Sequence, residues 1–207
     1  MSSVFLTSAI VDSAIPLSER GPAPKEVVVG FGFWLFLLSD IVLFAALFAC
    51  YAVLSDAVAG GPIGPALFDR SRVFMETLCL LLSSVTCGFG SLAVQRRRRF
   101  ATYMWLAATF VLGTLFVKQE FTEFGGMLSS GAGPTRSAFL SAFYTLVGTH
   151  GLHVSIGLVW LLGMISQLLT LGFQPMVQRR FFCFALFWHA LDIVWIGVFT
   201  IVYLGAH

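Results

Sequence analysis

Five long apolar stretches, separated by short polar connections, dominate the hydrophobic pattern of the chain. Each approaches or exceeds the ~20 residues that an α-helix needs to cross a bilayer. No gap between them is long enough for a folded soluble domain. The pattern predicts an all-α integral membrane protein in which residues 30–207 form one five-transmembrane-helix bundle, with spans at about 31–54, 73–94, 101–124, 138–171 and 181–204.

The first 29 residues differ from the rest of the chain, because they are mixed in polarity and poorly periodic. They contain Pro16, Pro22 and Pro24. The apolar run VFLTSAIV is short and has no basic residue before it, so it does not match a signal peptide. We expect residues 1–29 to form a flexible cytoplasmic tail.

Composition supports a membrane location, because only 11% of the 207 residues are charged and 58% are hydrophobic. Soluble domains have about 25% charged residues. The net charge of +2 comes from basic residues scattered between apolar stretches, which argues against a nucleic-acid site. All four cysteines fall inside apolar stretches, so we interpret them as small buried side chains and not as a disulfide framework.

Basic residues set the expected orientation, since cytoplasmic loops are enriched in Lys and Arg. Eight lie in the N-terminal tail and the second and fourth connections, against three in the first and third connections. We therefore expect the N-terminus in the cytoplasm and the C-terminus on the opposite, outer side of the membrane. The strongest topology signal, which is also compatible with contact to lipid headgroups, is the run Arg96, Arg97, Arg98 and Arg99.

Polar residues at membrane depth are the candidate functional groups. His150 and His153 share one face of the fourth stretch, and His189 and Asp192 share one face of the fifth. Asp40 lies about 15 Å from the cytoplasmic start of the first helix. Ionisable groups inside a membrane are costly and usually face other helices or a polar cavity. We expect these five side chains to share a middle band in the bundle interior.

Three roles have to be considered for these side chains: ligation of a haem or metal, hydrogen bonding between helices, and proton transfer. His150 or His153 with His189 supplies two axial ligands for a haem b, in a membrane anchor or oxidoreductase, or three ligands for a metal. Alternatively, the imidazoles form hydrogen bonds between helices with hydroxyls, Asp192 or a backbone carbonyl. Asp40, His189 and Asp192 are candidates for part of a proton path, but no route that is continuous across the bilayer is visible in the sequence. The sequence shows no recognisable nucleophilic site, since the pair Ser83–Ser84 lacks an evident base partner.

Charged residues also gather toward the outer ends of the second and third helices. Since Arg70, Arg72 and Arg136 are close in depth to Glu76, Lys118, Glu120 and Glu123, we expect a belt of external ion pairs among these residues. Small residues four apart, Ser84 with Gly88 and Gly151 with Ser155, predict close helix contacts.

Three runs carry a family resemblance: GFWLFLLSDIVLFAALFACYAVL, GPTRSAFLSAFYTLVGTHGLHVSIGLVW and FWHALDIVWIGVFTIVYL. Together they resemble subunit III of haem–copper terminal oxidases, and are most similar to the subunits III of cytochrome bo-type ubiquinol oxidases. The resemblance covers about residues 30–205. Asp40 occupies the F-x-x-S-[E/D] position, where an Asp is typical of the quinol-oxidising members.

The resemblance implies a non-catalytic subunit of a proton-translocating complex that passes electrons from ubiquinol to oxygen. It also implies a multi-pass protein of the bacterial inner membrane, with the expected outer C-terminus in the periplasm. It implies no redox cofactor in this chain, with haems and copper in subunit I. It implies packing against subunit I in a complex with subunits II and IV, lipid binding, and support of assembly and proton uptake. The polar positions that carry over, with a structural or lipid-associated role and no catalytic, cofactor or metal role, are Asp40, Glu123, His150, His153, His189 and Asp192.

Overall fold

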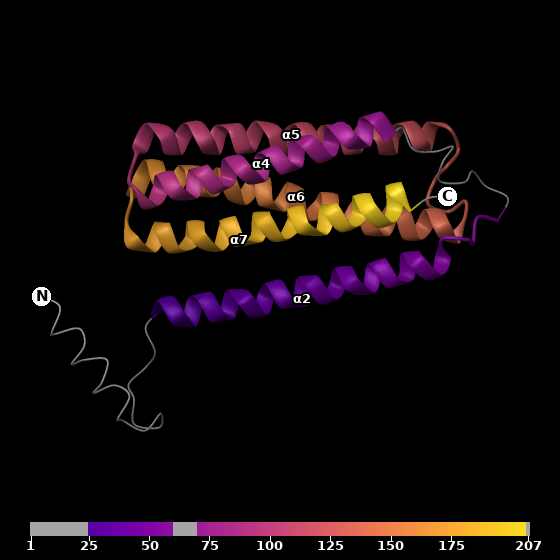
Figure 1. Ribbon diagram of the computed structural model, residues 1–207, viewed down its shortest axis with the longest axis horizontal. Coiled ribbons are helices and arrows are strands. Elements are labelled where there is room, and N and C mark those ends of the chain that lie inside the picture. The colour runs from indigo at the N-terminus through magenta and orange to yellow at the C-terminus, as the bar shows by residue number, and fades with distance from the viewer. Residues whose placement is uncertain (1–24, 60–69, 206–207) are drawn as a thin grey trace, which may run out of the picture. The chain divides into compact units, whose positions relative to one another are not determined.

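The computed structural model describes residues 25–59 and 70–205, and all regular secondary structure in these ranges is helical (Figure 1). Five helices are long and apolar enough to cross a membrane. The expected number and order of spans is confirmed. The elements are α2 (Lys25–Leu54), α4 (Arg70–Gln95), α5 (Arg99–Ser129), α6 (Ala138–Leu171), α7 (Pro175–Val198) and a terminal π-helix, η2 (Phe199–Leu204).

Most helices are longer than the apolar stretches that predicted them. α2 begins at Lys25, so the helix includes the last five residues of the expected tail, whereas residues 1–24 lie outside the described residues. Polar residues can extend a helix beyond the hydrocarbon layer because its backbone hydrogen bonds are all internal. Hydropathy therefore predicts the membrane-embedded part of each helix and not its ends.

Local signals fix the ends of α6 and α7. Ser137 has extended backbone angles, and its hydroxyl accepts a hydrogen bond from the Leu140 amide, so it caps the N-terminus of α6. Gly172 ends α6 with a φ of 69°, a conformation that glycine adopts without steric cost. Pro175 starts α7, where a missing amide hydrogen costs nothing.

Among the described residues, 37–59 and 70–205 belong to one compact unit, and 25–36 belong to another. Within the larger unit, α4 contacts α5, α5 contacts α6, α6 contacts α7, and α7 returns to α4. The four helices thus close into a ring (Figure 1). From residue 37 onward, α2 contributes aromatic rings to this unit: Phe44 lies against His153, and Tyr51 against Phe139.

The centre of the ring is organised around Trp188 of α7, which is 2% exposed. Its indole nitrogen donates a hydrogen bond to the hydroxyl of Ser83 on α4. Its ring lies so close to α5 and α6 that a methyl group at Gly113 would come within 2.9 Å of it, and one at Gly157 within 3.0 Å. One side chain from α7 therefore contacts the other three helices of the ring.

The outer surfaces of the helices are apolar, which is the expected arrangement when the solvent is lipid. Large hydrophobic side chains stay exposed along every helix, among them Val42, Val53, Phe121, Val159 and Ile193. The interior, by contrast, includes polar groups from each of the four ring helices.

Candidate functional site

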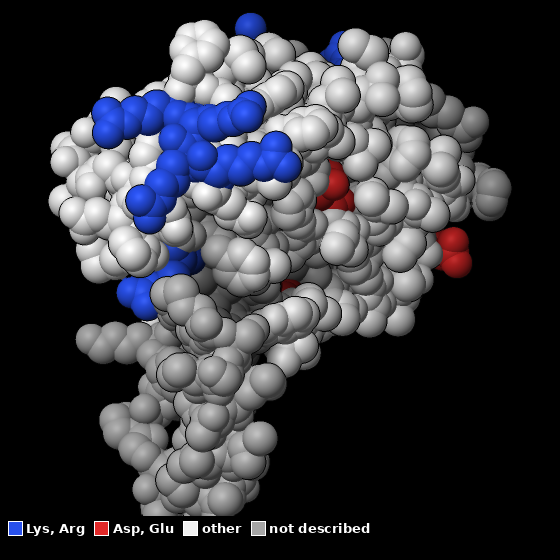
Figure 2. All heavy atoms as spheres, turned by 60° about the vertical axis from the view of Figure 1, so that its left-hand side comes forward, with Lys and Arg blue, Asp and Glu red and all other residues white. Residues whose placement is uncertain are grey.

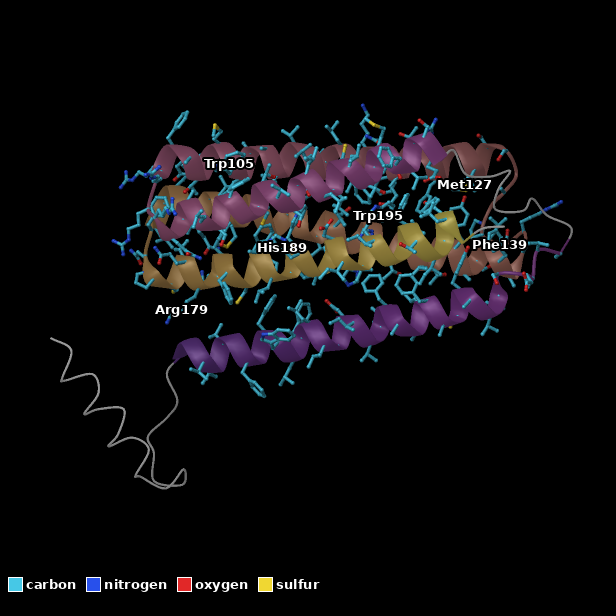
Figure 3. The ribbon with its side chains drawn as sticks, in the orientation of Figure 1. Trp105, Met127, Phe139, Arg179, His189 and Trp195 are labelled. Carbon is cyan, nitrogen blue, oxygen red and sulfur yellow. The ribbon has the colours of Figure 1, made fainter. Side chains whose placement is uncertain are left out.

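A seam of hydrogen bonds joins α4 to α7. The indole of Trp195 donates to the Thr77 hydroxyl at 3.1 Å, and that of Trp188 donates to Ser83, also at 3.1 Å. One residue further along α4, the Ser84 hydroxyl lies 2.7 Å from Nδ1 of His189. Figure 3 labels His189 and Trp195 along α7, between Arg179 and the C-terminal end of the helix. Three side-chain hydrogen bonds thus join these two antiparallel helices.

Ser84, His189 and Asp192 form a small polar cluster within this seam. The Ser84 hydroxyl also interacts with the Asp192 carboxylate, so one hydroxyl serves both side chains. The expectation that Ser84 has no base partner is wrong, because the partner comes from another helix. The arrangement still differs from a nucleophilic triad, in which the acid holds the far nitrogen of the histidine. Here the carboxylate contacts the serine itself.

His150 is completely buried on α6 and lies among aromatic rings. Its Nε2–H donates to the backbone carbonyl of Leu191 on α7 at 3.2 Å. The ring centroids of Trp195 and Phe116 lie 5.1 and 5.7 Å from that of the imidazole, and the Phe44 centroid lies 6.3 Å away. Rings from three other helices therefore occupy the space around this histidine.

His153 and Asp40 lie nearer the surface of the unit than His150. Nδ1–H of His153 donates to the Thr149 carbonyl of its own helix at 2.7 Å, and its ring packs against Phe44 at 5.3 Å. One carboxylate oxygen of Asp40 is buried and has no hydrogen-bond partner among the described residues. The predicted polar band is thus divided: His189 and Asp192 face α4, whereas His150 faces α5 and α7.

Three glutamates form a buried cluster between α4 and α5. Glu76, Glu120 and Glu123 are 0%, 3% and 7% exposed, and their carboxyl groups interact electrostatically with one another. The hydroxyl of Tyr203, in η2, donates to Oε2 of Glu123 at 3.3 Å. The π-helical turn, a feature frequent at functional sites, carries this tyrosine into the cluster.

The glutamate cluster also reaches α6. A methyl group at Gly151 would lie 2.6 Å from a carboxylate oxygen of Glu120, so the glycine leaves room for that side chain. The expected belt of external ion pairs is therefore wrong for the acidic residues, which are buried. The sequence contains an indication of this clustering, because Glu120 and Glu123 are three residues apart and share a helix face.

Basic residues lie at both ends of the bundle. Arg96, Arg97, Arg98 and Arg99 are all exposed at the turn between α4 and α5, and Figure 2 shows basic side chains gathered on that end of the molecule. Arg180, at the same end of α7, donates to the amide oxygen of Gln167. At the opposite end, Arg72, Lys118 and Arg136 are exposed.

This geometry bears on the haem and metal hypotheses. Nε2 of His150 carries a hydrogen that is donated to a carbonyl, so it has no lone pair for a metal. Nδ1 of His150 has no hydrogen-bond partner among the described residues, and the rings of Phe116 and Trp195 pack against the imidazole with centroids 5.7 and 5.1 Å away. Among the described residues, no group of three or more His, Cys, Asp or Glu side chains is arranged to hold a metal ion. The buried polar groups instead suit hydrogen bonding between helices.

Comparison with known proteins identifies the family. The family model for cytochrome c oxidase subunit III matches residues 19–207. The chain belongs to this family. The expected resemblance to the third subunits of terminal oxidases is thereby confirmed.

Curated relatives cover most of the chain. Cytochrome bo(3) ubiquinol oxidase subunit 3 of Pseudomonas aeruginosa is 51% identical over 174 residues, which is 84% of this chain and 83% of the relative. Quinol oxidase subunit 3 of Bacillus subtilis is 43% identical over 173 residues (84% and 85%). Cytochrome c oxidase subunit 3 of Bacillus sp. (strain PS3) is 43% identical over 176 residues (84% of each). The chain is thus a multi-pass membrane subunit of a bacterial respiratory oxidase.

Proposed function

We propose that the chain is the non-catalytic third subunit of a proton-translocating cytochrome bo-type ubiquinol oxidase. Electrons pass from ubiquinol to oxygen in subunit I, which holds the haems and copper, and this chain supports that subunit without a redox centre of its own. The observation that carries the proposal is the state of His150: its Nε2–H is bonded to the Leu191 carbonyl, and aromatic rings enclose it. In this proposal the imidazole of His150 serves to hold α6 and α7 together.

Two observations favour ubiquinol as the electron donor. Ubiquinol oxidase subunits from two Pseudomonas species are each 51% identical to the chain, whereas a quinol oxidase subunit and a cytochrome c oxidase subunit from Bacillus are both 43% identical, so the support comes from the Pseudomonas relatives. In addition, Asp40 occupies a position where the quinol-oxidising members resemble this chain in having an aspartate.

The proposed partners follow from the surfaces of the bundle. Exposed apolar side chains on the helices suit both lipid and the transmembrane helices of subunit I, which in turn associates with subunits II and IV. In this proposal six polar positions keep the bundle in the shape that subunit I and lipids recognise: Glu123, His150 and Asp192, which are buried, and Asp40, His153 and His189, which are half-buried. Assembly and proton uptake by the complex depend on that shape.

We further propose that the N-terminus is cytoplasmic and the C-terminus periplasmic. The exposed arginines at the α4–α5 turn and the Arg179–Arg180 pair lie on the same side of the chain as the N-terminal tail when five helices alternate in direction. Short loops rich in Arg stay in the cytoplasm.

Substitution of His150 tests the structural role. His150→Ala removes a buried ring and one interhelical hydrogen bond, so we expect the bundle to lose about 2–4 kcal/mol of stability. The tagged complex should then retain less of this chain after detergent extraction, while haem per subunit I stays unchanged. His153→Ala is the matched control, because its bond lies within its own helix and its ring is half-buried. Loss of haem with full retention of the mutant chain would contradict the proposal.

A further inference from the structure

The glutamate cluster contains buried carboxyl oxygens without a hydrogen-bond donor. Both carboxyl oxygens of Glu76 and both of Glu120 are buried and lack a hydrogen-bond partner among the described residues. The two side chains are 0% and 3% exposed. An ionised carboxylate only accepts hydrogen bonds, and its burial without donors carries a high free-energy cost. A protonated carboxyl is itself a donor, so a bound proton suits these oxygens.

The charges around the two carboxyls also favour a bound proton. Glu76 and Glu120 interact electrostatically with each other and with Glu123, and like charges at close range oppose ionisation of all three together. Arg72, an exposed residue one turn before Glu76, interacts electrostatically with that glutamate. A single arginine does not offset the charge of both buried side chains. Within the described part of the chain, the cluster is not arranged to hold a metal ion instead.

The helices on the other side of the cluster add two phenols and no charge. On α6, Tyr144 interacts electrostatically with Glu123, and the backbone at Gly151 passes directly over the Glu120 carboxyl. From η2, the Tyr203 hydroxyl donates to Glu123 and interacts electrostatically with all three glutamates. These neutral groups enclose the carboxyls without balancing a negative charge, so the argument for a bound proton stands on every side.

Tyr203 connects the cluster with the surface of the bundle. A pocket of about 380 Å³ lies between the start of α4 and η2, and Tyr203 is part of its lining. The same phenol donates to Oε2 of Glu123 at 3.3 Å. A phenol oxygen can accept a proton while its own hydroxyl donates one, so this side chain suits a proton relay between the pocket and the carboxyls.

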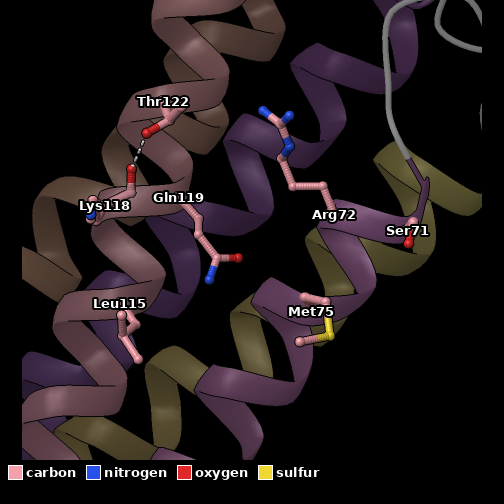
Figure 4. A pocket seen from close by; sticks show the side chains of 7 residues that line it. All are labelled: Ser71, Arg72, Met75, Leu115, Lys118, Gln119 and Thr122. Atoms are coloured by element: carbon pink, nitrogen blue, oxygen red, sulfur yellow. Dashed lines mark hydrogen bonds between the residues drawn. The ribbon is translucent and has the colours of Figure 1, made fainter.

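A second pocket on the neighbouring face offers no such link. It has a volume of about 490 Å³ and lies between α4 and α5, where Figure 4 shows Arg72 and Gln119 extending from the two helices. None of the three carboxyls lines it. The hydrogen bond from Tyr203 therefore favours the pocket beside η2 as the point of entry.

The cluster lies close to one end of the bundle. With a rise of ~1.5 Å per residue from the turn at Arg96–Arg98, Glu76 lies about 30 Å along α4 and Glu120 about 33 Å along α5. The hydrocarbon core of a bilayer is about 30 Å thick. The carboxyls thus lie near the membrane surface opposite the arginine-rich turn, where water is available to the pocket beside Tyr203.

We propose that Glu76 and Glu120 form a proton-binding site that exchanges protons with water at this end of the bundle through Glu123 and Tyr203. For entry, a hydronium ion in the pocket gives a proton to the Tyr203 oxygen while the phenol gives its own proton to a Glu123 carboxylate. Water, a neutral phenol and a neutral carboxyl result. Glu123 then passes the proton to an ionised neighbour, and release follows the reverse order.

The site goes beyond the structural role proposed above, because it gives a subunit without a redox centre a store of exchangeable protons. It does not depend on whether ubiquinol is the electron donor. The test reads the carboxyls themselves and needs no measurement of oxidase activity, so its outcome is separate from that of the proposed function.

Infrared difference spectroscopy of the purified oxidase complex tests the site, because protonated and ionised carboxyls have separate C=O stretching bands. At neutral pH, Glu76→Gln and Glu120→Gln should each remove intensity from a protonated-carboxyl band that shifts in D₂O. In the wild type, this band should fall as the pH is raised and protons leave. Asp56→Asn is the matched control, because Asp56 is exposed and should contribute no protonated band at neutral pH.

Glutamine resembles a protonated glutamate in shape and neutrality, so both variants should assemble like the wild type. Failure of both to assemble would show that the negative charges are required, and would overturn the proposal. An unchanged protonated-carboxyl band in both variants would overturn it as well. If one variant alone fails to assemble, the spectrum of the other decides.

The relay has its own test in the rate at which the band shifts after transfer of the complex to D₂O. A positioned proton-transfer group contributes about 10²–10⁴-fold to a rate, so Tyr203→Phe should slow the exchange at least about a hundredfold while the band itself remains. Tyr51→Phe is the matched control, since Tyr51 is also buried but packs against Phe139. Exchange at the wild-type rate in Tyr203→Phe would contradict entry through this phenol.

Discussion

At the scale of single residues, packing in the bundle depends on glycines, which leave room for large side chains on neighbouring helices. Trp188 occupies the centre because Gly113 and Gly157 leave space for its ring on two neighbouring helices. Gly151 does the same for the Glu120 carboxylate. In lipid, where burial of apolar surface does not by itself favour helix association, such close packing is a main source of stability.

A methyl group at Gly157 should disturb this packing. Gly157→Ala places a carbon 3.0–3.3 Å from the rings of Trp188 and Phe187, and we expect a loss of about 1–3 kcal/mol of stability from overpacking. Thermal unfolding of the purified complex, with release of this chain as the signal, measures it. Gly163→Ala is the matched control on the same helix, because nothing lies within 4 Å of the added carbon. Equal effects of the two substitutions would argue against Trp188 as the central contact.

The sequence predicted some of these residues and not others. The close approach at Gly151 was predicted from its pairing with Ser155, but Gly88, paired with Ser84 by the same rule, faces open space. The neighbour Gly90, which the rule passed over, lies against Leu106 instead. Spacing shows which residues share a face, but the partner helix decides which face is packed, and that is a tertiary property.

Spacing also could not predict which partners the ionisable side chains contact. His150 and His189 were expected to face inward, and they contact other helices, but they do so in separate places. The partner of His189, Ser84, lies 105 positions away in the sequence. Glu76 and Glu120 were expected to lie in an external belt because they are near helix ends, yet the ring of four helices encloses both side chains.

At the scale of elements, hydropathy predicted all five helices because a membrane span must satisfy its own backbone hydrogen bonds. Helix ends were less accurate: α5 continues to Ser129 and α7 begins at Pro175. The loop between α4 and α5 is short and basic, and Arg97 adopts a positive φ of 53° within it. This turn is the element on which the proposed orientation mainly depends.

Neutralising that turn should disturb insertion. Changing Arg96–Arg99 to glutamine leaves four basic residues on the proposed cytoplasmic side against three on the other, so we expect a mixed orientation. Reporter fusions to the α4–α5 turn and to the C-terminus measure it. Arg136→Gln removes a charge from the opposite side and should leave the orientation unchanged. Insertion that is the same with and without the four arginines would show that other signals set the topology.

At the scale of the whole molecule, the bundle has an apolar exterior, basic residues at both ends and buried polar groups within its interior, some of which form hydrogen bonds between helices. That division suits a subunit that is held by lipid and by neighbouring helices. Membership in the cytochrome c oxidase subunit III family places it in a respiratory oxidase, where it packs with other subunits. The central claim is that the interior histidines stabilise the bundle and bind no haem.

The most direct measurement is a reduced-minus-oxidised absorption spectrum taken on two samples. One is the tagged chain purified in mild detergent from its native membranes together with its partners, and the other is the same chain expressed and purified alone. The account predicts haem bands in the complex and none in the lone chain, because rings and a carbonyl occupy the surroundings of His150. Stoichiometric haem in the lone chain, abolished by His150→Ala or His189→Ala, would contradict it.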